Sequence, residues 1–497
     1  MKLLERIKKI ASRYNGAAID SILLTFVKVI TALLGIIVTK LLSMHFTLHE
    51  YGTYSEAMLI VTTASSLAIF GLTDAVNYFY NAADTEEKKE NYVGTIFTIE
   101  YIVGIICAAV IMAIQIPLIN YFKNESLKDI LFFVAWLPLF QNLIPMFQVL
   151  FVSIGRAKLI AVRNLVFSTA RLIVVLIACF VTKSIITIFI ILLLLDLAQV
   201  VYFIVAFGRR KFKISIRHFR KQLIKPILEF SIPMAVYVLA TVLSRDIDKY
   251  VISFFSDTST LAIYANAAKL LPFDLVTQSF ITVLIPIITR QVAAADFKQA
   301  KHSFKAYLRL GYVATWIIVS CVIINAKEAM LILYDPKYLP GLAVFIIYLF
   351  VDMIKFATTP MILIAKGKSR TLMICTLCSL AANFALNMIT FPIMGMIGPA
   401  ISTFVTTFGL IAVLLALDGK AINTNAFQLF DWKEMLIVFL EMALAGGGAY
   451  LLKLLLYRFT ASPVIIMGIS SGIYFVALLL LNRKRLMDCF RTINMMK

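Results

Sequence analysis

The sequence predicts an α-helical integral membrane protein, and three observations carry this prediction. Hydrophobic residues make up 61% of the 497 residues, and the mean hydropathy is +0.92, which is far above the value of a soluble globular chain. Apolar runs of about 18 residues or more recur along the whole chain, and each is long enough to cross a bilayer. The short alternating segments of a membrane β-barrel are missing from the sequence. We therefore predict an all-α chain with about 14 transmembrane helices.

The candidate spans follow one another with short connections. They cover residues 17–43, 54–80, 93–118, 130–153, 160–181, 185–207, 228–255, 262–288, 306–325, 340–365, 371–391, 396–417, 435–456 and 463–481. The longest connection, Gly208–Lys225, reads GRRKFKISIRHFRKQLIK and separates the first six spans from the next six. We interpret it as a basic segment that lies on anionic lipid headgroups. The last two spans have no counterpart in the first half.

The two groups of six spans carry a weak internal repeat. Tyr54 precedes Tyr264 by 210 residues, and the GRAK of Gly155–Lys158 precedes the GKSR of Gly367–Arg370 by 212. Because six is even, the two copies have the same orientation, which predicts two six-helix lobes in a parallel pseudo-repeat plus two C-terminal helices. The predicted domains are an N-terminal lobe (1–207), a basic cytoplasmic inter-lobe loop (208–226), a C-terminal lobe (227–417), and two additional helices with a basic cytoplasmic tail (418–497).

The formal net charge of +20 reflects membrane orientation. If the N-terminus is cytoplasmic, the inside segments hold 33 Lys and Arg residues and the outside loops hold six. This asymmetry predicts that both termini lie in the cytoplasm. The basic residues are not interleaved with aromatic residues in base-stacking motifs, so nucleic acid is not predicted as a partner.

The sequence shows no catalytic constellation, and we predict that the protein is not an enzyme. It has no phosphate-binding loop of an ATP-driven pump, and no long external loop that could house a glycosyltransferase or ligase site. Cys375 and Cys378 have metal-ligand spacing but no second pair of Cys or His nearby, so no metal site is predicted.

Charged residues inside the spans are the remaining candidates for a binding site. A charge in bilayer hydrocarbon is costly and usually faces a bundle interior or a wet cavity. The predicted cavity cations are Lys28, Arg171, Arg245, Lys249 and Lys269. A diphosphate needs cationic donors, and the guanidinium of Arg suits phosphate oxygens.

Structural pairing is the alternative interpretation of some of these charges. Arg245 and Asp248, like Asp246 and Lys249, are three residues apart on one helix, where opposite charges can pair. Lys453 lies near the end of its span and is predicted to extend its ammonium group to the interface.

Further polar residues inside the spans are candidates for ion coupling or for lining a cavity. These predicted residues are Asp20, Asp246, Asp248, Asn383 and Asn387. Other acidic residues also lie inside spans, and the sequence does not rank them: Asp74, Glu100, Asp196, Asp274 and Glu441.

Several stretches, in order and spacing, resemble a known family. They are TKLLSMHFTLHEYGTYSEA (Thr39–Ala57), FSIPM (Phe230–Met234) with Asp248 and Tyr264 after it, AKEAMLILYDPKY (Ala326–Tyr338), Gly367-Lys368, Asn383-x-x-x-Asn387 and GMIGPAIST (Gly395–Thr403). Asp335 stands where the family usually has Gly, and Pro399 where Ala is commoner. Together they resemble the polysaccharide flippases of the multidrug/oligosaccharidyl-lipid/polysaccharide exporter superfamily, the group that includes O-antigen and teichuronic-acid exporters.

The resemblance implies a function and a mechanism. It implies a secondary transporter of the bacterial inner membrane that flips an undecaprenyl-diphosphate-linked oligosaccharide to the outer leaflet by alternating access, for surface polysaccharide biosynthesis. Cavity cations would bind the diphosphate, and a proton or sodium gradient would drive transport without a bound cofactor. Expected partners are the lipid-linked substrate, membrane lipids and, as a candidate, polysaccharide polymerase machinery; we expect a monomer. The alternative is an ion-coupled multidrug extruder of the same fold, whose cavity should be lined with carboxylates and aromatic residues.

Overall fold

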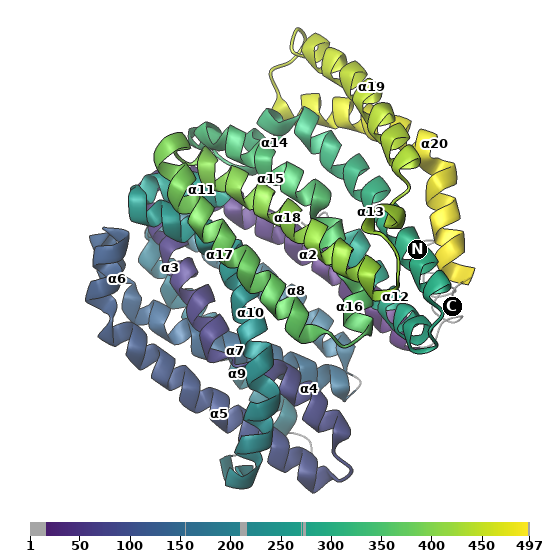
Figure 1. Ribbon diagram of the computed structural model, residues 1–497. Coiled ribbons are helices and arrows are strands. Elements are labelled where there is room, and N and C mark those ends of the chain that lie inside the picture. Colours follow the sequence, from purple (N-terminus) through teal and green to yellow (C-terminus); the bar gives the residue numbers. More distant parts are fainter. Residues whose placement is uncertain (1–15, 155, 209–215, 270, 272–274, 496–497) are drawn as a thin grey trace, which may run out of the picture. The chain divides into compact units, whose positions relative to one another are not determined.

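The structure is a computed structural model that describes residues 16–154, 156–208, 216–269, 271 and 275–495. The described residues form helices and their connections, with no β-strand among them (Figure 1). The chain divides into two compact units, which are residues 1–243 and 244–497. Each unit is therefore described by itself.

The first unit contains eight α-helices and the beginning of a ninth within the described residues. They are α2 (Gly16–His45), α3 (Leu48–Ala68), α4 (Leu72–Ala82), α5 (Glu86–Ala113), α6 (Gln115–Phe122), α7 (Leu131–Ser153), α8 (Ala157–Ile177), α9 (Ile185–Gly208) and the first part of α10 (Lys221–Phe255), with short turns η1 (Glu125–Asp129), η2 (Ala178–Thr182) and η3 (Ile216–His218).

Eight of these α-helices lie wholly within the first unit, and α10 continues into the second.

The second unit takes up the rest of α10 and the helices that follow it. They are α11 (Thr258–Ala267), α12 (Leu275–Ala293), α13 (Phe297–Ile324), α14 (Ala326–Leu333), α15 (Leu342–Ile354), α16 (Met361–Ala365), α17 (Ser369–Met394), α18 (Ile397–Ala421), α19 (Trp432–Leu456) and α20 (Pro463–Met495), with short turns η5 (Pro336–Gly341), η6 (Lys355–Thr358) and η7 (Ala426–Leu429).

Thirteen segments of the described chain are helical, long and apolar enough to cross a membrane. Each overlaps one of the predicted spans, and only the predicted span 262–288 has no full-length counterpart among the described residues. The predicted fold class, an all-α integral membrane protein, is confirmed. The chain passes from one compact unit to the other inside α10, at Leu243 and Ser244, whereas the predicted lobes join in the loop 208–226. The internal repeat and the lobe limits stay predictions.

Side-chain caps define several helix starts. Thr47 accepts a hydrogen bond from the backbone N–H of Glu50, and the Glu50 carboxylate accepts one from the N–H of Thr47 at 2.8 Å. This reciprocal capping box satisfies donors that the first turn of α3 leaves free. Thr85, Asp257 and Asp296 cap α5, α11 and α13 in the simpler form, with one side-chain oxygen each.

The predicted span 262–288 is wrong as a continuous helix. The helix α11 ends at Ala267, and the backbone N–H of Leu271 donates to the Asp352 carboxylate at 3.2 Å. That donor is therefore withdrawn from an α-helical ladder. Residues 270 and 272–274 lie outside the described part of the chain.

The predicted span 54–80 is also interrupted. The helix α3 ends at Ala68 and α4 begins at Leu72, because Phe70 and Gly71 adopt φ angles of +44° and +67°. These angles lie in the left-handed region, which a helix cannot contain and which glycine adopts at little cost. A Cβ atom at position 71 would lie 2.6 Å from the carbonyl oxygen of Ser231 and 2.9 Å from the Cβ of Met234, both on α10. The missing side chain thus permits both the backbone angle and the close approach of α10.

We expect Gly71→Ala to destabilise the protein by about 1–3 kcal/mol, because it adds backbone strain and a steric clash at one position. Gly468→Ala is the matched control, since position 468 lies inside α20 and a Cβ there meets no atom within 4 Å. The control should leave stability unchanged or raise it by roughly 0.5–1 kcal/mol. Thermal unfolding of both variants in one detergent checks this. Equal midpoints for Gly71→Ala and the wild type would contradict the steric argument.

An apolar core fills the first unit between α4, α5, α7 and α9. It includes a row of aromatic rings in which Phe147 stacks on Phe203 with centroids 5.2 Å apart, while Phe97 lies 4.6 Å from Phe147. Offset and edge contacts of this kind stabilise aromatic pairs beyond the area that they bury. This core fixes the positions of α7 and α9, which carry part of the site described below.

Ion pairs join α19 to α14 and the last two helices to each other. Lys453 on α19 pairs with Glu328 on α14 at 2.7 Å, and Arg485 on α20 pairs with Glu441 on α19 at 2.5 Å. The side chain of Glu328 is only 1% exposed and that of Lys453 only 10%. The prediction that Lys453 extends to the interface is therefore wrong, because a buried carboxylate on another helix lies within reach of its ammonium group.

Candidate functional site

A polar cavity of about 420 Å³ lies within the first unit. Its polar lining comes from four helices. These residues are Thr31 on α2, Gln141 on α7, Arg163, Asn164, Ser168 and Arg171 on α8, and Asp196 and Gln199 on α9. Polar side chains that converge in a concave site inside a membrane protein are the usual mark of a binding site.

The helix α8 places two arginines in this cavity. Arg163 and Arg171 are eight residues apart, which is a little over two turns, so both lie on one face of the helix. The Arg171 side chain is exposed to the cavity, and one Nη donates to the hydroxyl oxygen of Tyr54 on α3 at 3.3 Å. A guanidinium has five N–H donors, and this bond uses one of them. The other N–H groups of Arg171 can therefore donate to a ligand.

Arg163 is more deeply placed than Arg171. Its guanidinium donates to the amide oxygens of Asn164, at 2.7 Å, and Gln199, and it lies 5.2 Å from the ring centroid of Phe203. Its Nε is buried and has no hydrogen-bond partner among the described residues. The stacking on an aromatic ring and the two amide contacts fix the orientation of this cation.

A carboxylate balances part of the positive charge. Asp196 on α9 accepts hydrogen bonds from Gln199 at 2.9 Å and from Gln141 at 3.3 Å. The amide groups hold the carboxylate in place while the two arginines leave the cavity lining with a formal excess of one positive charge. The arrangement can bind an anionic group at Arg171, while Gln199 connects Asp196 to Arg163 through hydrogen bonds to both.

Lys28, one of the predicted cavity cations, lies one helical turn before Thr31, which lines the cavity. It is exposed on α2, and the hydroxyl of Thr31, which lines the cavity one turn later, donates to the Lys28 carbonyl at 2.9 Å. The helix α2 packs along α8, the helix that carries both arginines. Asp20 also belongs to α2, but its side chain lies outside the described part of the structure.

The predicted charges of α10 form a local cluster in the second unit. Asp246 is 5% exposed in its side chain and accepts from both Arg245, at 3.0 Å, and Lys249, at 2.5 Å. The predicted pair of Asp246 with Lys249 is present. The predicted pair of Arg245 with Asp248 is wrong, because the neighbouring Asp246 is the partner of Arg245.

Asp248 is buried and serves a different set of donors. The hydroxyl groups of Tyr264, at 2.6 Å, and Tyr348 both donate to one carboxylate oxygen, and the backbone N–H of Lys249 donates to the other at 2.8 Å. These bonds connect α10 with α11 and α15. Asp248 therefore links three helices through hydrogen bonds.

Asn383 and Asn387 lie in the seam between α17 and α18. The amide of Asn383 donates to Thr406 at 2.8 Å and to Thr403 at 3.2 Å, and the amide of Asn387 donates to Asn383 at 2.8 Å. Both asparagines are buried. In the structure they bond the two helices to each other.

Lys269 is exposed in the connection after α11. It is therefore at a helix end, while the sequence places it inside an uninterrupted span. Lys269, Arg245 and Lys249 belong to the second unit, whereas Lys28 and Arg171 belong to the first.

Sequence reasoning missed most of the polar lining, including Arg163, Gln141 and Gln199. Arg163 lies near the start of the predicted span 160–181 and is not among the predicted cavity cations, but α8 begins at Ala157 and includes it. Its spacing of eight residues from Arg171 is the signal that could have found it, because this spacing puts both on one helix face. No sequence signal distinguishes Gln141 and Gln199 from other glutamines in apolar helices.

Comparisons with known proteins place the chain among membrane proteins of similar fold. A family model described as "Polysaccharide biosynthesis protein" matches residues 37–342, which is more than half of the chain. A comparison with curated proteins found no match. Among solved structures, the lipid II flippase MurJ in an inward closed conformation has a TM-score of 0.73 at 16% identity, over 94% of this chain and 100% of that one.

Two further solved structures are transporters of the MOP superfamily. An inward-facing multidrug resistance MATE family transporter has a TM-score of 0.67 at 10% identity, over 79% of this chain and 96% of its own. A transporter from Pyrococcus furiosus has a TM-score of 0.58 at 12% identity, over 82% of this chain and 94% of its own. At these identities the similarity establishes a shared fold.

Proposed function

Because the chain belongs to the polysaccharide biosynthesis protein family, we propose that it is a secondary transporter that flips a lipid-linked oligosaccharide across the membrane. The proposed substrate is an undecaprenyl-diphosphate-linked oligosaccharide, moved from the inner to the outer leaflet by alternating access for surface polysaccharide biosynthesis. The family match over residues 37–342 is the observation that carries this proposal. The fold shared with MurJ supports it, since that protein is a lipid II flippase.

The cavity of the first unit supplies a chemical reason for an anionic substrate. Arg171 offers guanidinium N–H groups on the surface of the cavity, and a guanidinium can donate two parallel hydrogen bonds to phosphate oxygens. Arg163 stands behind it on the same face of α8 and adds positive potential. We propose that Arg171 binds the diphosphate, with Lys28 on α2 as a second cation, one helical turn from Thr31 of the cavity lining.

The energy source and the setting complete the proposal. A proton or sodium gradient would drive transport, with no bound cofactor and no catalytic step, in keeping with a transporter. The 33-to-six distribution of Lys and Arg residues favours cytoplasmic termini in a bacterial inner membrane. Polysaccharide polymerase machinery is a candidate partner, and a monomer is the proposed state.

An ion-coupled multidrug extruder is the second candidate function. Two observations favour it: the fold is shared with a MATE family transporter, and the carboxylate of Asp196 lies in the same cavity as the arginines. A cationic drug would need that carboxylate free of competing cations. The excess of positive charge in the lining makes this candidate the weaker one.

Transport in proteoliposomes tests the proposed function. The vesicles contain a fluorescent undecaprenyl-diphosphate oligosaccharide, and its movement to the outer leaflet is followed with and without an imposed proton or sodium gradient. We expect gradient-stimulated movement with the wild type and none in protein-free vesicles. Export of a cationic dye without movement of the lipid-linked sugar would replace the flippase proposal with the multidrug one.

A further inference from the structure

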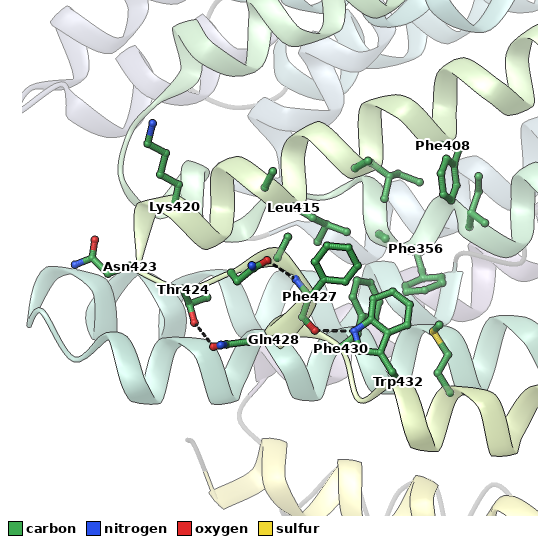
Figure 2. Close-up of a pocket in the computed structure, with 18 of the residues that line it drawn as sticks. Phe356, Phe408, Leu415, Lys420, Asn423, Thr424, Phe427, Gln428, Phe430 and Trp432 are labelled. Carbon is green, nitrogen blue, oxygen red and sulfur yellow. Dashed lines mark hydrogen bonds between the residues drawn. The ribbon is translucent and has the colours of Figure 1, made fainter.

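The second unit contains a larger and more apolar cavity, of about 1010 Å³, which the proposed function does not use. It lies between α13, the end of α15, α18, η7 and the start of α19 (Figure 2). Its body is lined by Trp316, Phe356, Phe408, Leu415, Phe427 and Trp432. A volume of this size holds an organic molecule of drug size or one lipid chain.

The indole N–H groups of both tryptophans in this cavity are bonded to backbone carbonyls. The indole N–H of Trp432 donates to the carbonyl of Phe427 at 2.7 Å, and that of Trp316 donates to the carbonyl of Met353 at 3.1 Å. With both N–H groups bonded to the protein, the indole rings offer apolar surface to an occupant. The cavity body is therefore suited to a hydrocarbon chain.

One end of the same cavity is polar and positively charged. Lys420, Asn423, Thr424 and Gln428 line this end, and Figure 2 shows Thr424 and Gln428 joined by a hydrogen bond. Lys301 on α13 donates to the Thr424 hydroxyl at 2.9 Å and to the Gln428 amide oxygen at 2.7 Å. The ammonium group of Lys301 thus lies directly behind the polar end.

Both lysines are unneutralised. Neither Lys301 nor Lys420 makes an ion pair within the part of the chain that the structure describes, whereas the nearby Lys305 pairs with Asp431 at 3.6 Å. The apolar lining ends at Lys420, and Lys301 lies behind the Thr424 and Gln428 side chains, so the cavity complements an amphipathic anion. In a chain that crosses a membrane, the abundant molecule of that chemistry is an anionic phospholipid.

Exposed aromatic residues of the cavity lining lie at helix ends, close in sequence to the polar end, which points to a position near the membrane–water interface. Phe427 is 69% exposed and Trp432 is 47% exposed, and they lie where α18 has ended and α19 begins. Exposed aromatic side chains at the ends of spans are typical of the headgroup level. The sequence predicts that residues 290–309 and 418–433, which include Lys301 and Lys420, face the cytoplasm. The cytoplasmic leaflet is the one whose anionic lipids attract basic residues.

We propose that this cavity is a binding site for an anionic phospholipid of the cytoplasmic leaflet. One acyl chain occupies the apolar body, and the phosphate lies at Lys420 and Lys301. The choice of leaflet depends on the predicted orientation, and the site is independent of the proposed transport substrate.

Quenching of tryptophan fluorescence by brominated lipids tests the proposal on the full-length protein. Two of its three tryptophans, Trp316 and Trp432, line the cavity. Phosphatidylglycerol with brominated chains is titrated into phosphatidylcholine nanodiscs, and brominated phosphatidylcholine is the reference. We expect saturable quenching by phosphatidylglycerol at a low mole fraction, beyond the quenching by phosphatidylcholine. Equal quenching by the two lipids would overturn the proposal.

Two pairs of variants separate the headgroup site from the chain site. Lys420→Gln should weaken the apparent affinity for phosphatidylglycerol about fivefold, since a cation near the lipid surface contributes about that factor, while the exposed Lys327→Gln should not change it. Ala416→Phe, which fills the cavity, should abolish the saturable component, while Ala443→Phe on the exposed face of α19 should preserve it. Unchanged quenching in a folded Ala416→Phe protein would show that no chain enters the cavity.

A competition experiment identifies the occupant. Unlabelled phosphatidylglycerol should restore the fluorescence of the wild type, and a polyprenyl phosphate should do so only at higher concentration. Stronger competition by the polyprenyl phosphate would assign the cavity to an isoprenoid lipid and overturn the phospholipid proposal. The transport assay above is not needed for any of these readouts, so failure here leaves the proposed function standing.

Discussion

Arg171→Ala should reduce flipping of the lipid-linked oligosaccharide by roughly 10- to 150-fold, which corresponds to the loss of one charged hydrogen-bonding group from a bound anion. Arg171 is the cation on the surface of the polar cavity, and its hydrogen bond to Tyr54 orients it without consuming most of its donors. The initial rate of substrate movement in proteoliposomes measures the effect. The expected loss of transport rate assumes that Arg171 contacts the diphosphate directly.

Three controls make this prediction specific. Arg171→Lys keeps the charge but cannot donate two parallel hydrogen bonds, so its rate should lie between those of the wild type and Arg171→Ala. Tyr54→Phe removes only the orienting partner and should cost less than Arg171→Ala. Arg458→Ala, an exposed arginine of the second unit, should transport like the wild type. Wild-type rates in a folded Arg171→Ala protein would remove Arg171 from the substrate site.

Lys453→Met should destabilise the protein by about 3–5 kcal/mol, because it leaves the carboxylate of Glu328 buried without its counter-ion. The pair joins α19 to α14 at 2.7 Å, and Glu328 is 1% exposed in its side chain. The hydroxyl of Tyr457 also donates to Glu328, but a neutral donor does not replace the positive charge. The thermal unfolding midpoint in detergent measures the change.

The double variant Lys453→Met with Glu328→Gln is the matched control. Removal of both charges should restore most of the lost stability, since a buried ion pair contributes little compared with well-packed neutral groups. A double variant no more stable than the single one would mean that Lys453 acts through packing. The exposed Lys327→Met, on the same helix as Glu328, should be neutral.

The stability change should depend on pH in a defined direction. Burial raises the pKa of the Glu328 carboxyl, but the hydrogen bonds from Lys453 and Tyr457 outweigh it and hold that pKa below its ordinary value of 4.5. A carboxyl with a lowered pKa stabilises the fold above its unfolded pKa, and this contribution is lost as the pH falls through the folded value. The stabilisation that the wild type gains from this ionised carboxylate should therefore be complete near neutral pH and should be lost as the pH falls below about 4.5, so the difference from Lys453→Met should shrink there.

The candidate site was predictable only in part. Arg171 was found from the sequence because a charge in the middle of an apolar run is conspicuous. Arg163 was not predicted because it lies near the start of its helix, where a sequence does not distinguish a loop cation from a buried one. Asp196 was one of several acidic residues inside spans, and only the packing of α8 against α9 brings it beside the two arginines.

The sequence by itself determined the fold class, the number of spans to within one, and a set of charges worth examining. These properties depend on sums over contiguous residues: hydropathy over a length that crosses a bilayer, and charge over a loop. A resemblance in ordered short stretches also pointed to the family that the match over residues 37–342 established.

Only the tertiary structure decided which charges are paired and where helices break. Arg245 pairs with its neighbour Asp246, Lys453 is buried against Glu328, and the chain turns at Gly71 because α10 passes close to it. Each of these outcomes depends on distances between side chains or helices. Spacing along one chain sets which residues share a helix face, but the packing of different helices sets which of those faces meet.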